Sequence, residues 1–499
     1  MDVDLVMAVD VLPVASLETF SQNLYRQRRR AVGVAAFIVF AFTGWLALEI
    51  PKGILAQTDE LLTAERTREM LLTNPWVVHY NFERSFEKPP LQYWLSMLTL
   101  PRFENRAVAV RIWPLAYASL TAIVLGWLAF LVEPTRPWLI PLSVAILVSC
   151  PLFPTEATRA MLDIGLTFFT TLTIAFSEFA RKRPAWWLAV AVACWLASLQ
   201  KVPLPFLVWV LIVLVRLTTR DERAALRSGK SWLIGSVLLA LAAISIWPLL
   251  QLIKYEMPVG VTFHQEVVVW LGPEGLGRRP YFEVLLGLCL AGGVGGLLLL
   301  LAPFVNLFSK KEKLSPAVRE IAIVSLAVIV LTIVSNFRGV RYILPILPCL
   351  CFLLALVFCR FLGQGSVVRR RTIKALVVLL SAGLVQAELK IILRQKDVAN
   401  EKVVAEKLGA LQQAGTKTVL VEAINFGGGL MWDSFYLFHG NFRFPLERYT
   451  LDEIRRDPPK PPVIGVCVAR DFSAVREVYP TLQVQFTRAQ FICWQVPGQ

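Results

Sequence analysis

Two adjacent carboxylates and a lysine within residues 58–94 are the side chains whose types and spacing best suit chemistry. Asp59 and Glu60 stand together, and Lys88 precedes two prolines, which stiffen the backbone behind it. A carboxylate can accept a proton from a hydroxyl group, and a rigidly placed ammonium suits a phosphate. We therefore expect a site in this segment where a hydroxyl is activated beside a bound phosphate.

A further acid, Asp163, stands at the junction into an apolar segment. A carboxylate at a membrane boundary is costly unless it is solvated, paired or used. Cations follow on the same predicted side of the membrane, and an anionic lipid phosphate would account for arginines placed there. These later residues are Arg278, Arg279, Arg338 and Arg341, the last followed by Tyr342. A single histidine, His264, could pair with Glu87 or Glu266 to hold a metal, although one histidine is a weak signal.

Each of these residues also has a purely structural explanation. Acidic residues in the first turn of a helix complement its dipole, which would account for Asp59 and Glu60. Asp163 could pair with Arg159 one turn earlier. Lys88 could extend its ammonium to the membrane surface, and the outer arginines could bind ordinary lipid head groups. The sequence leaves these alternatives open.

The composition is that of a polytopic membrane protein. Of 499 residues, 56% are hydrophobic and 17% are charged, against about a quarter charged in soluble domains. The apolar residues form about eleven blocks long enough to suggest membrane spans. These blocks are 31–50, 107–132, 138–153, 164–180, 185–200, 202–217, 232–252, 281–303, 319–336, 342–361 and 375–388. The net charge of +15 is therefore no nucleic-acid signal, because membrane proteins collect Lys and Arg in cytoplasmic loops.

Basic residues set the expected orientation. A cluster at 26–30 precedes the first span, no cleavable signal peptide is recognisable, and five successive even-numbered turns are basic. We expect a cytoplasmic amino-terminal tail over 1–30 and a membrane domain over 31–388. The first outer loop, 51–106, is large. Nearly all the unusual polar residues then fall on the non-cytoplasmic face.

The tail 389–499 has the alternating pattern of a small soluble α/β domain on the same outer side. Residues 401–413 predict a helix, and 416–423, 462–469 and 482–496 predict strands. Cys467 and Cys493 could pair if this domain lies in an oxidising compartment.

Together these motifs resemble the lipid-linked-sugar glycosyltransferases of the GT-C superfamily. Within it they are most similar to the aminoarabinose transferases of glycosyltransferase family 83, in the protein-mannosyltransferase-like group. The resemblance rests on Asp59-Glu60, the block Phe86-Glu87-Lys88-Pro89-Pro90, Arg159-Ala-Met-Leu-Asp163 and Arg341-Tyr342-Ile-Leu-Pro345. It implies a GT-C fold: an α-helical polytopic membrane protein with about 11–13 transmembrane helices and a soluble α/β tail.

The resemblance also implies roles for individual residues. Asp59 corresponds to the candidate catalytic acid or base, with Asp163 as the second-loop aspartate and Glu60 beside the first. Lys88 would contact the polyprenyl phosphate, assisted by Tyr342 and by outer arginines among Arg278, Arg279, Arg338 and Arg341. No cofactor is required in such enzymes. Some members hold a divalent metal between two positions that match Glu87 and His264.

We therefore expect transfer of a sugar from an undecaprenyl-phosphate donor to a lipid, glycan or protein acceptor. The expected setting is the periplasmic face of a bacterial inner membrane, with membrane lipids but no nucleic acid as partners. One departure matters for specificity, because Leu61-Leu62-Thr63 replaces the usual Gly-Arg-Tyr after the acidic pair. The sequence therefore names neither the sugar nor the acceptor. The alternative is a transporter or flippase of a polyprenyl-linked lipid, which would place its charges near the midplane.

Overall fold

A computed structural model describes most of the chain. The described residues are 14–258, 260, 285–287, 289–290, 292–308, 314–334, 340–395, 398–421 and 429–498. The predicted site residues His264, Arg278, Arg279 and Arg338 lie outside these ranges.

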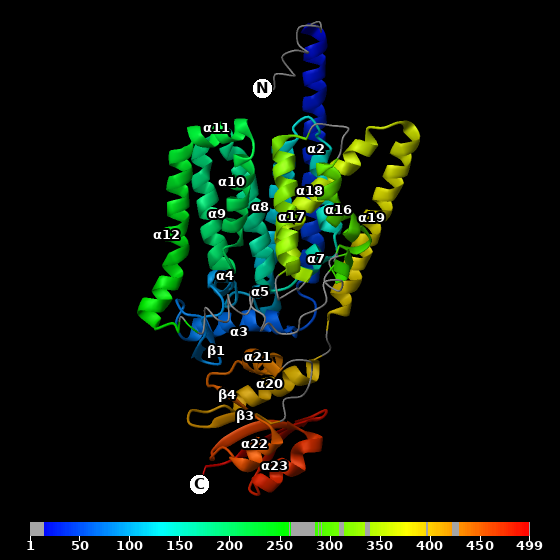
Figure 1. The fold of residues 1–499 in the computed structure, drawn as a ribbon. Coiled ribbons are helices and arrows are strands. Elements are labelled where there is room, and N and C mark those ends of the chain that lie inside the picture. The colour runs from blue at the N-terminus through cyan, green and yellow to red at the C-terminus, as the bar shows by residue number, and fades with distance from the viewer. Residues whose placement is uncertain are drawn as a thin grey trace.

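A bundle of roughly parallel helices forms the body of the molecule (Figure 1). Seven helical segments among the described residues are long and apolar enough to cross a membrane, and four shorter apolar helices run beside them. The bundle helices are α2 (Val14–Glu49), α5 (Arg106–Val132), α6 (Leu139–Ser149), α8 (Leu162–Ala180), α9 (Trp187–Gln200), α10 (Leu204–Leu217), α12 (Lys230–Tyr255), α16 (Gly296–Leu307), α17 (Pro316–Val334), α18 (Leu347–Leu362) and α19 (Ser366–Leu393). Each predicted span overlaps one of them. The chain is a multi-pass membrane protein.

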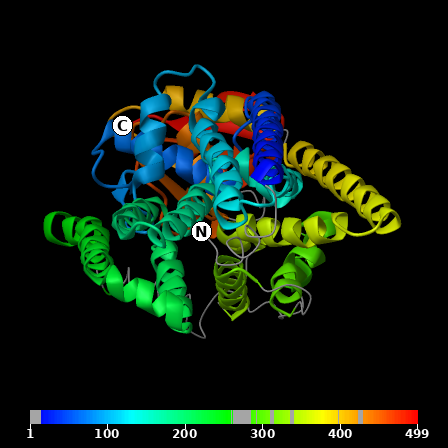
Figure 2. The ribbon, with the colours of Figure 1, turned by 90° about the horizontal axis from the view of Figure 1, so that it is seen from above.

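The helices pack through small residues. Ala118, Ala122 and Ala129 of α5 are fully buried and recur at helical spacing, which lets neighbouring backbones approach closely. Seen from above, α12 and α19 lie at opposite edges of the bundle (Figure 2). Their membrane windows are only 11% and 22% buried, so both helices present most of their apolar surface to lipid.

Charged residues tie the helices together at the end where the amino terminus lies. Arg216 Nε donates to Glu320 at 2.8 Å, and its Nη2 lies 3.2 Å from Glu178. Arg181 bonds the same Glu320 at 2.6 Å. Helices α8, α10 and α17 are thereby joined by paired charges, as burial requires. The short helix α11 (Arg220–Ser228) lies at this same end (Figure 1).

The opposite end is covered by the first outer loop. It contains α3 (Thr58–Leu72), the hairpin β1 (His79–Tyr80) and β2 (Glu83–Arg84), and α4 (Leu91–Thr99), which lie across the bundle (Figure 1). Gln57 occupies the N-cap position of α3, without a side-chain capping bond.

The carboxyl-terminal domain is a mixed sheet with helices on both faces. The strand order is β4-β3-β5-β7-β6, in which β3 runs parallel to β4 and β5, while β7 runs antiparallel to β5 and β6. The strands are β3 (Lys417–Val421), β4 (Leu446–Tyr449), β5 (Val463–Val468), β6 (Gln483–Arg488) and β7 (Phe491–Val496). The helices are α20 (Ala399–Leu411), α21 (Gly429–His439), α22 (Leu451–Arg456) and α23 (Phe472–Val478).

Two of the tail predictions need correction. The single strand predicted over 482–496 is a hairpin, β6–β7, and β4 was not predicted. Cys467 and Cys493 are free: they stand on adjacent strands but pack into different apolar clusters, so they do not pair.

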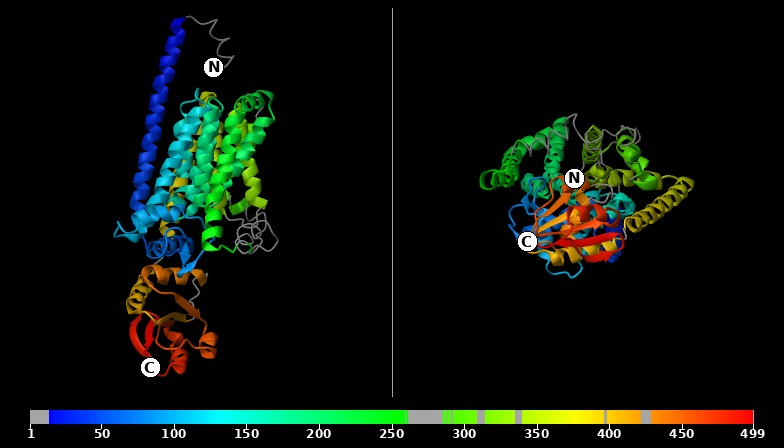
Figure 3. Two further views of the ribbon diagram at one scale, coloured as in Figure 1. Left: turned by 90° about the vertical axis from the view of Figure 1, so that its left-hand side faces the viewer. Right: turned by 90° about the horizontal axis from the view of Figure 1, so that it is seen from below.

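The tail domain docks on α3. Apolar residues of α3 share one buried cluster with α20, α21 and the sheet, and Figures 1 and 3 show the domain below the outer loop. Arg68 of α3 donates to the carbonyl of Phe442 at 2.6 Å, and His439 of α21 lies 2.9 Å from the carbonyl of Leu55. These contacts place the domain over the outer end of the bundle.

Candidate active site

Asp59, in the first turn of α3, is the first residue of the candidate site. Its side chain is 44% exposed and forms an ion pair with Arg341, which itself is 32% exposed. Burial alone would raise the pKa of Asp59, but the charges of Arg341, Arg159 and Lys201 hold that pKa below its usual range. Asp59 is therefore a carboxylate at neutral pH, within reach of solvent and flanked by cations.

Asp163 contributes a second carboxylate from the first turn of α8. It is only 2% exposed, and its Oδ1 lies 2.6 Å from Nζ of Lys201. The alternative pairing with Arg159 is not formed, because Arg159 instead bonds Glu156 at 3.2 Å and Gln57 at 3.0 Å. The partner of Asp163 is thus a lysine from a helix that follows it in the chain.

Close packing of α8 against α9 positions Lys201 beside Asp163. A Cβ added at Gly165 would lie 2.4 Å from the Gln200 amide nitrogen, so a larger residue there would force this side chain to move. Gln200 then donates to Gln92 and to the carbonyl of Leu162, each at 3.2 Å. Held in this way, Gln200 ends α9 beside the start of α8, and the next residue, Lys201, meets Asp163.

The 3-10 helix η4 (Val340–Ile346) completes the cluster with Arg341 and Tyr342. The Lys201 ammonium lies 5.1 Å from the centroid of the Tyr342 ring, and the Arg341 guanidinium lies 5.7 Å from it. Arg341 interacts electrostatically with both Asp59 and Asp163. Two acids and two cations from four separate elements therefore meet around one aromatic ring, at the outer end of the bundle.

Lys88 stands at the edge of this cluster, in the turn before α4. It is partly buried and interacts electrostatically with Tyr342. Its neighbour Glu87 lies 2.6 Å from Nη2 of Arg66, which is itself buried in α3. This ion pair fixes the Glu87-Lys88 turn against α3, on the same side as Asp59. The structure thus brings together Asp59, Asp163, Lys88, Arg341 and Tyr342 of the predicted residues.

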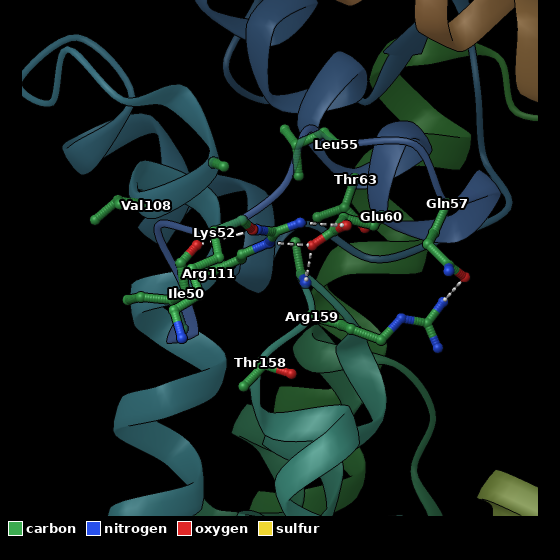
Figure 4. Close-up of polar contacts among 12 residues, drawn as sticks. Ile50, Lys52, Leu55, Gln57, Glu60, Thr63, Val108, Arg111, Thr158 and Arg159 are labelled. Carbon is green, nitrogen blue, oxygen red and sulfur yellow. Dashed lines mark hydrogen bonds and ion pairs between the residues drawn. The ribbon is translucent and has the colours of Figure 1, made fainter. Parts of the chain in front are cut away.

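Glu60 points elsewhere. Its side chain is 1% exposed, and its two oxygens accept bonds from Arg111 Nε at 2.7 Å and Nη2 at 3.0 Å (Figure 4). The backbone N–H of Ala160 donates to it at 3.1 Å, while Arg111 also bonds the carbonyls of Ile50 and Lys52. Burial would raise the pKa of Glu60, but Arg111 lowers it overall. This pairing anchors α3 to α5 and favours a positioning role for Glu60, whose expected catalytic role stays a prediction.

Lys201 is the site residue that sequence reasoning missed. It falls at the sharp turn between α9 and α10, where its backbone adopts φ −157° and ψ −65°. A lysine at such a turn, between two apolar helices on the outer face, was the available signal. Within the described residues no group of three or more metal-ligating side chains exists, and the predicted Glu87–His264 pair lies partly outside them.

Part of the sequence and the fold of the chain are similar to those of known glycosyltransferases of the membrane. Residues 54–256 match the family described as dolichyl-phosphate-mannose-protein mannosyltransferase. This match contains Asp59, Lys88, Asp163 and Lys201. The fold is also that of the archaeal oligosaccharyltransferase of Archaeoglobus fulgidus in complex with an inhibitory peptide and a dolichol-phosphate. That similarity has a TM-score of 0.60 at 9% identity and covers 92% of this chain and 74% of that one.

More particular similarities lead to the aminoarabinose transferases. An undecaprenyl phosphate-alpha-4-amino-4-deoxy-L-arabinose arabinosyl transferase of Sodalis glossinidius is 34% identical over 167 residues, covering 32% of this chain and 30% of that relative. Its counterpart from Yersinia enterocolitica is 28% identical over 215 residues, covering 42% and 39%. The chain thus matches well under half the length of these relatives. The crystal structure of ArnT from Cupriavidus metallidurans bound to undecaprenyl phosphate superimposes with a TM-score of 0.71 at 15% identity, covering 93% of this chain and 97% of that one.

These findings confirm the resemblance to GT-C, ArnT-like proteins and the expected fold class. The family match over residues 54–256 covers less than half of the chain, whereas the structural match covers 93% of it.

Proposed function

We propose that the chain is a membrane glycosyltransferase that moves a sugar from a polyprenyl-phosphate donor, of the undecaprenyl-phosphate type, to a lipid, glycan or protein acceptor. The observation that carries this proposal is the cluster of Asp59, Asp163, Lys201 and Arg341 around Tyr342, at the outer end of a bundle with the ArnT fold. The relatives named above are transferases that use an undecaprenyl-phosphate-linked sugar, which supports the donor class.

The chemistry follows from the charges. The acceptor's nucleophilic atom forms a bond to the anomeric carbon, and the bond from that carbon to the phosphate oxygen breaks. Asp59 takes the proton of the acceptor, and the polyprenyl phosphate leaves with the electron pair. Lys88 and Arg341 stabilise the charge that develops on the phosphate, as fixed cations do most effectively in a site with little water.

The ion pair between Asp59 and Arg341 gives donor binding a further effect. A phosphate that binds Arg341 competes with Asp59 for the guanidinium. Asp59 then loses the charge that lowers its pKa, and its affinity for the acceptor's proton increases. Asp163, held by Lys201, keeps the second cation oriented toward Tyr342 and the donor.

The reaction side of the membrane follows from the positive-inside rule. Helix α11 and the amino terminus lie at one end of the bundle, and α3, whose first turn carries Asp59, lies at the other end (Figure 1; Figure 3 gives a side view). The basic turns of the sequence belong to the first of these ends. We therefore propose a bacterial inner membrane with the active site and the tail domain in the periplasm. The charges of the site lie at one end of the bundle and not near its midplane, which favours an enzyme over a transporter.

No cofactor is needed for this reaction. The optional divalent metal remains a proposal that rests on Glu87 and His264, and Glu87 is engaged by Arg66 in the structure. The residues after the acidic pair bear on the substrate instead. Leu62 and Thr63 of α3 stand where the resemblance implies an arginine and a tyrosine, and Thr63 is buried while Leu62 is partly buried, so the cationic and aromatic groups typical of these positions are missing. Sugar and acceptor therefore need direct identification.

The decisive experiment is transfer by purified protein in vesicles, with a panel of radiolabelled polyprenyl-phosphate sugars and an envelope extract. Wild type is compared with Asp59→Asn and Lys88→Ala, and with the matched surface variants Asp457→Asn and Lys460→Ala in the tail, where both side chains are exposed. We expect label to move with wild type and both tail variants but not with the two site variants. Full transfer by Asp59→Asn would overturn the proposal.

A further inference from the structure

The turn before α8 contacts the start of α3 on both sides of Asp59. Nη2 of Arg159 donates a hydrogen bond to Oε1 of Gln57 at 3.0 Å (Figure 4). The backbone N–H of the next residue, Ala160, donates to the Glu60 carboxylate at 3.1 Å. Two consecutive residues of this turn therefore hold the first turn of α3, and Asp59 stands in the sequence between the two residues that they bond.

Gln57 uses its side chain to reach this turn and does not cap its own helix. It occupies the N-cap position of α3, where a side-chain oxygen commonly accepts a bond from a backbone N–H of the first turn. No such capping bond forms, and the amide oxygen accepts from Arg159 instead. The amide nitrogen lies 3.5 Å from the carbonyl oxygen of Arg394, at the end of α19. Gln57 therefore links the start of α3 to two other elements.

A buried carboxylate fixes the orientation of Arg159. Glu156, in the short helix α7 (Leu152–Ala157), is 2% exposed. Nη1 of Arg159 lies 3.2 and 3.3 Å from its two oxygens, and Nη1 of Arg394 lies 3.2 Å from Oε1. Because a buried carboxylate is stable only while it is paired, Glu156 restricts the guanidinium group that bonds both of its oxygens. One end of that group is thus held by α7 and the other by the start of α3.

This orientation brings the charge of Arg159 close to Asp59. Burial would raise the pKa of Asp59, but cations from three separate elements lower it overall: Arg341 of η4, Arg159 of the turn before α8, and Lys201 of the turn after α9. Arg341 forms an ion pair with Asp59 itself. Lys201 is paired with Asp163. Arg159 is instead held on α7, so it stays in place when a phosphate competes for Arg341.

We infer that Arg159 is a positioning residue for the proposed transfer, which fixes the first turn of α3 through Gln57 and keeps a positive charge near Asp59 when the donor phosphate engages Arg341. The inference rests on the proposed function, in which Asp59 is the base. A base must be ionised before it can take a proton from the acceptor. Arg159 therefore keeps Asp59 in its working form at the stage of the reaction when Arg341 is occupied.

The test follows the ionisation of Asp59 directly. A water-soluble carbodiimide modifies protonated carboxyl groups, and peptide mass spectrometry measures the modification of Asp59 in the purified full chain. The reaction is run in vesicles at about pH 5, above the usual pKa of an aspartate, with and without undecaprenyl phosphate. Arg159→Gln removes the charge, and Arg159→Lys keeps it. Arg394→Gln is the matched control, because it removes an equal charge from the same carboxylate, Glu156.

We expect Arg159→Gln to raise the modification rate of Asp59 roughly three- to tenfold, with the larger increase when undecaprenyl phosphate is present. Arg159→Lys restores a rate close to that of wild type, and Arg394→Gln stays within about twofold of it. An unchanged rate in Arg159→Gln, an equal increase in Arg394→Gln, or no rescue by Arg159→Lys would each overturn the inference.

A second variant keeps the inference testable if Arg159→Gln does not fold. Gln57→Leu removes the bond that turns Arg159 toward α3 and leaves every charge in place, so the modification rate of Asp59 increases if the inference is correct and stays unchanged if it is wrong. The readout does not depend on transfer. Loss of the proposed function, shown by full transfer in Asp59→Asn, is therefore distinguishable from loss of the role of Arg159.

Discussion

Adjacent acids with opposite roles give the sharpest prediction. Glu60 is fully buried against Arg111, whereas Asp59 is 44% exposed beside a partly exposed Arg341. Removing one partner of a buried ion pair leaves an uncompensated charge and costs roughly 3–5 kcal/mol. Glu60→Gln keeps one acceptor oxygen, so we expect the lower end, about 3 kcal/mol. An exposed pair contributes less than about 1 kcal/mol, so Asp59→Asn barely changes stability.

The expected loss of unfolding free energy in Glu60→Gln can be expressed as a decrease in melting temperature. Unfolding entropies of about 2 cal/mol/K per residue give about 1 kcal/mol/K for 499 residues, so Glu60→Gln lowers Tm by about 3 °C. Replacing both Glu60 and Arg111 with Met removes the unpaired charge and recovers part of that loss. Asp59→Asn instead lowers transfer by roughly 10² to 10⁴ at unchanged Tm.

The assay is thermal unfolding in detergent alongside the transfer assay, with Asp457→Asn as the control for an exposed carboxylate. The reasoning fails if Glu60→Gln keeps the wild-type Tm and loses transfer as completely as Asp59→Asn does. It also fails if Asp59→Asn unfolds several degrees early, because Asp59 would then be an anchor as well.

Three further outcomes follow from the same geometry. Because cations lower the pKa of Asp59, the transfer rate stays constant as the pH drops until the pH is below the usual pKa range of an aspartate. In Arg341→Gln this loss of rate at acid pH begins at a higher pH, which a pH–rate profile measures. Burial and the nearby Glu65 carboxylate raise the pKa of Glu69 to about 9, so the folded chain keeps a proton that the unfolded chain loses. Stability therefore falls between about pH 4.5 and 9, and Glu69→Gln flattens this dependence in thermal unfolding. Since Arg66 occupies Glu87, dialysis against a chelator leaves the transfer rate unchanged.

Each of these three predictions can be contradicted by a specific result. An acid limb that does not move in Arg341→Gln would mean that another group titrates. A pH dependence of Tm that persists in Glu69→Gln would assign it elsewhere. A loss of transfer on chelation, restored by one divalent ion, would place a metal at Glu87 in the working enzyme.

The fold could largely be predicted because hydropathy and basic loops constrain membrane topology strongly. Each of the eleven predicted spans overlaps an observed helix, and Asp59 and Asp163 lie at the same end, as the positive-inside rule required. The tail was harder. The β6–β7 turn passes through Ala489 at φ +49°, a position where Gly or Asn would have given a hairpin signal.

The partners within the site could not be predicted, because they depend on helix rotation and on packing. Successive residues of a helix point about 100° apart, so Asp59 and Glu60 face different neighbours although they are adjacent in sequence. Lys201 meets Asp163 across 38 residues, where Gly165 leaves room for the Gln200 side chain between their helices. No periodicity in the sequence encodes such a contact.

The docking of the tail on α3 has a consequence for how the protein is made. Arg68 bonds the carbonyl of Phe442 across 374 residues, and α3 shares its buried apolar cluster with α20 and α21. In the proposed orientation, the first outer loop is exported during synthesis long before those partners exist. Its buried polar and apolar groups are covered only after every later span has inserted and the tail has crossed. A nascent or truncated chain therefore carries an unfinished site, so export of the last hundred residues controls when activity can begin.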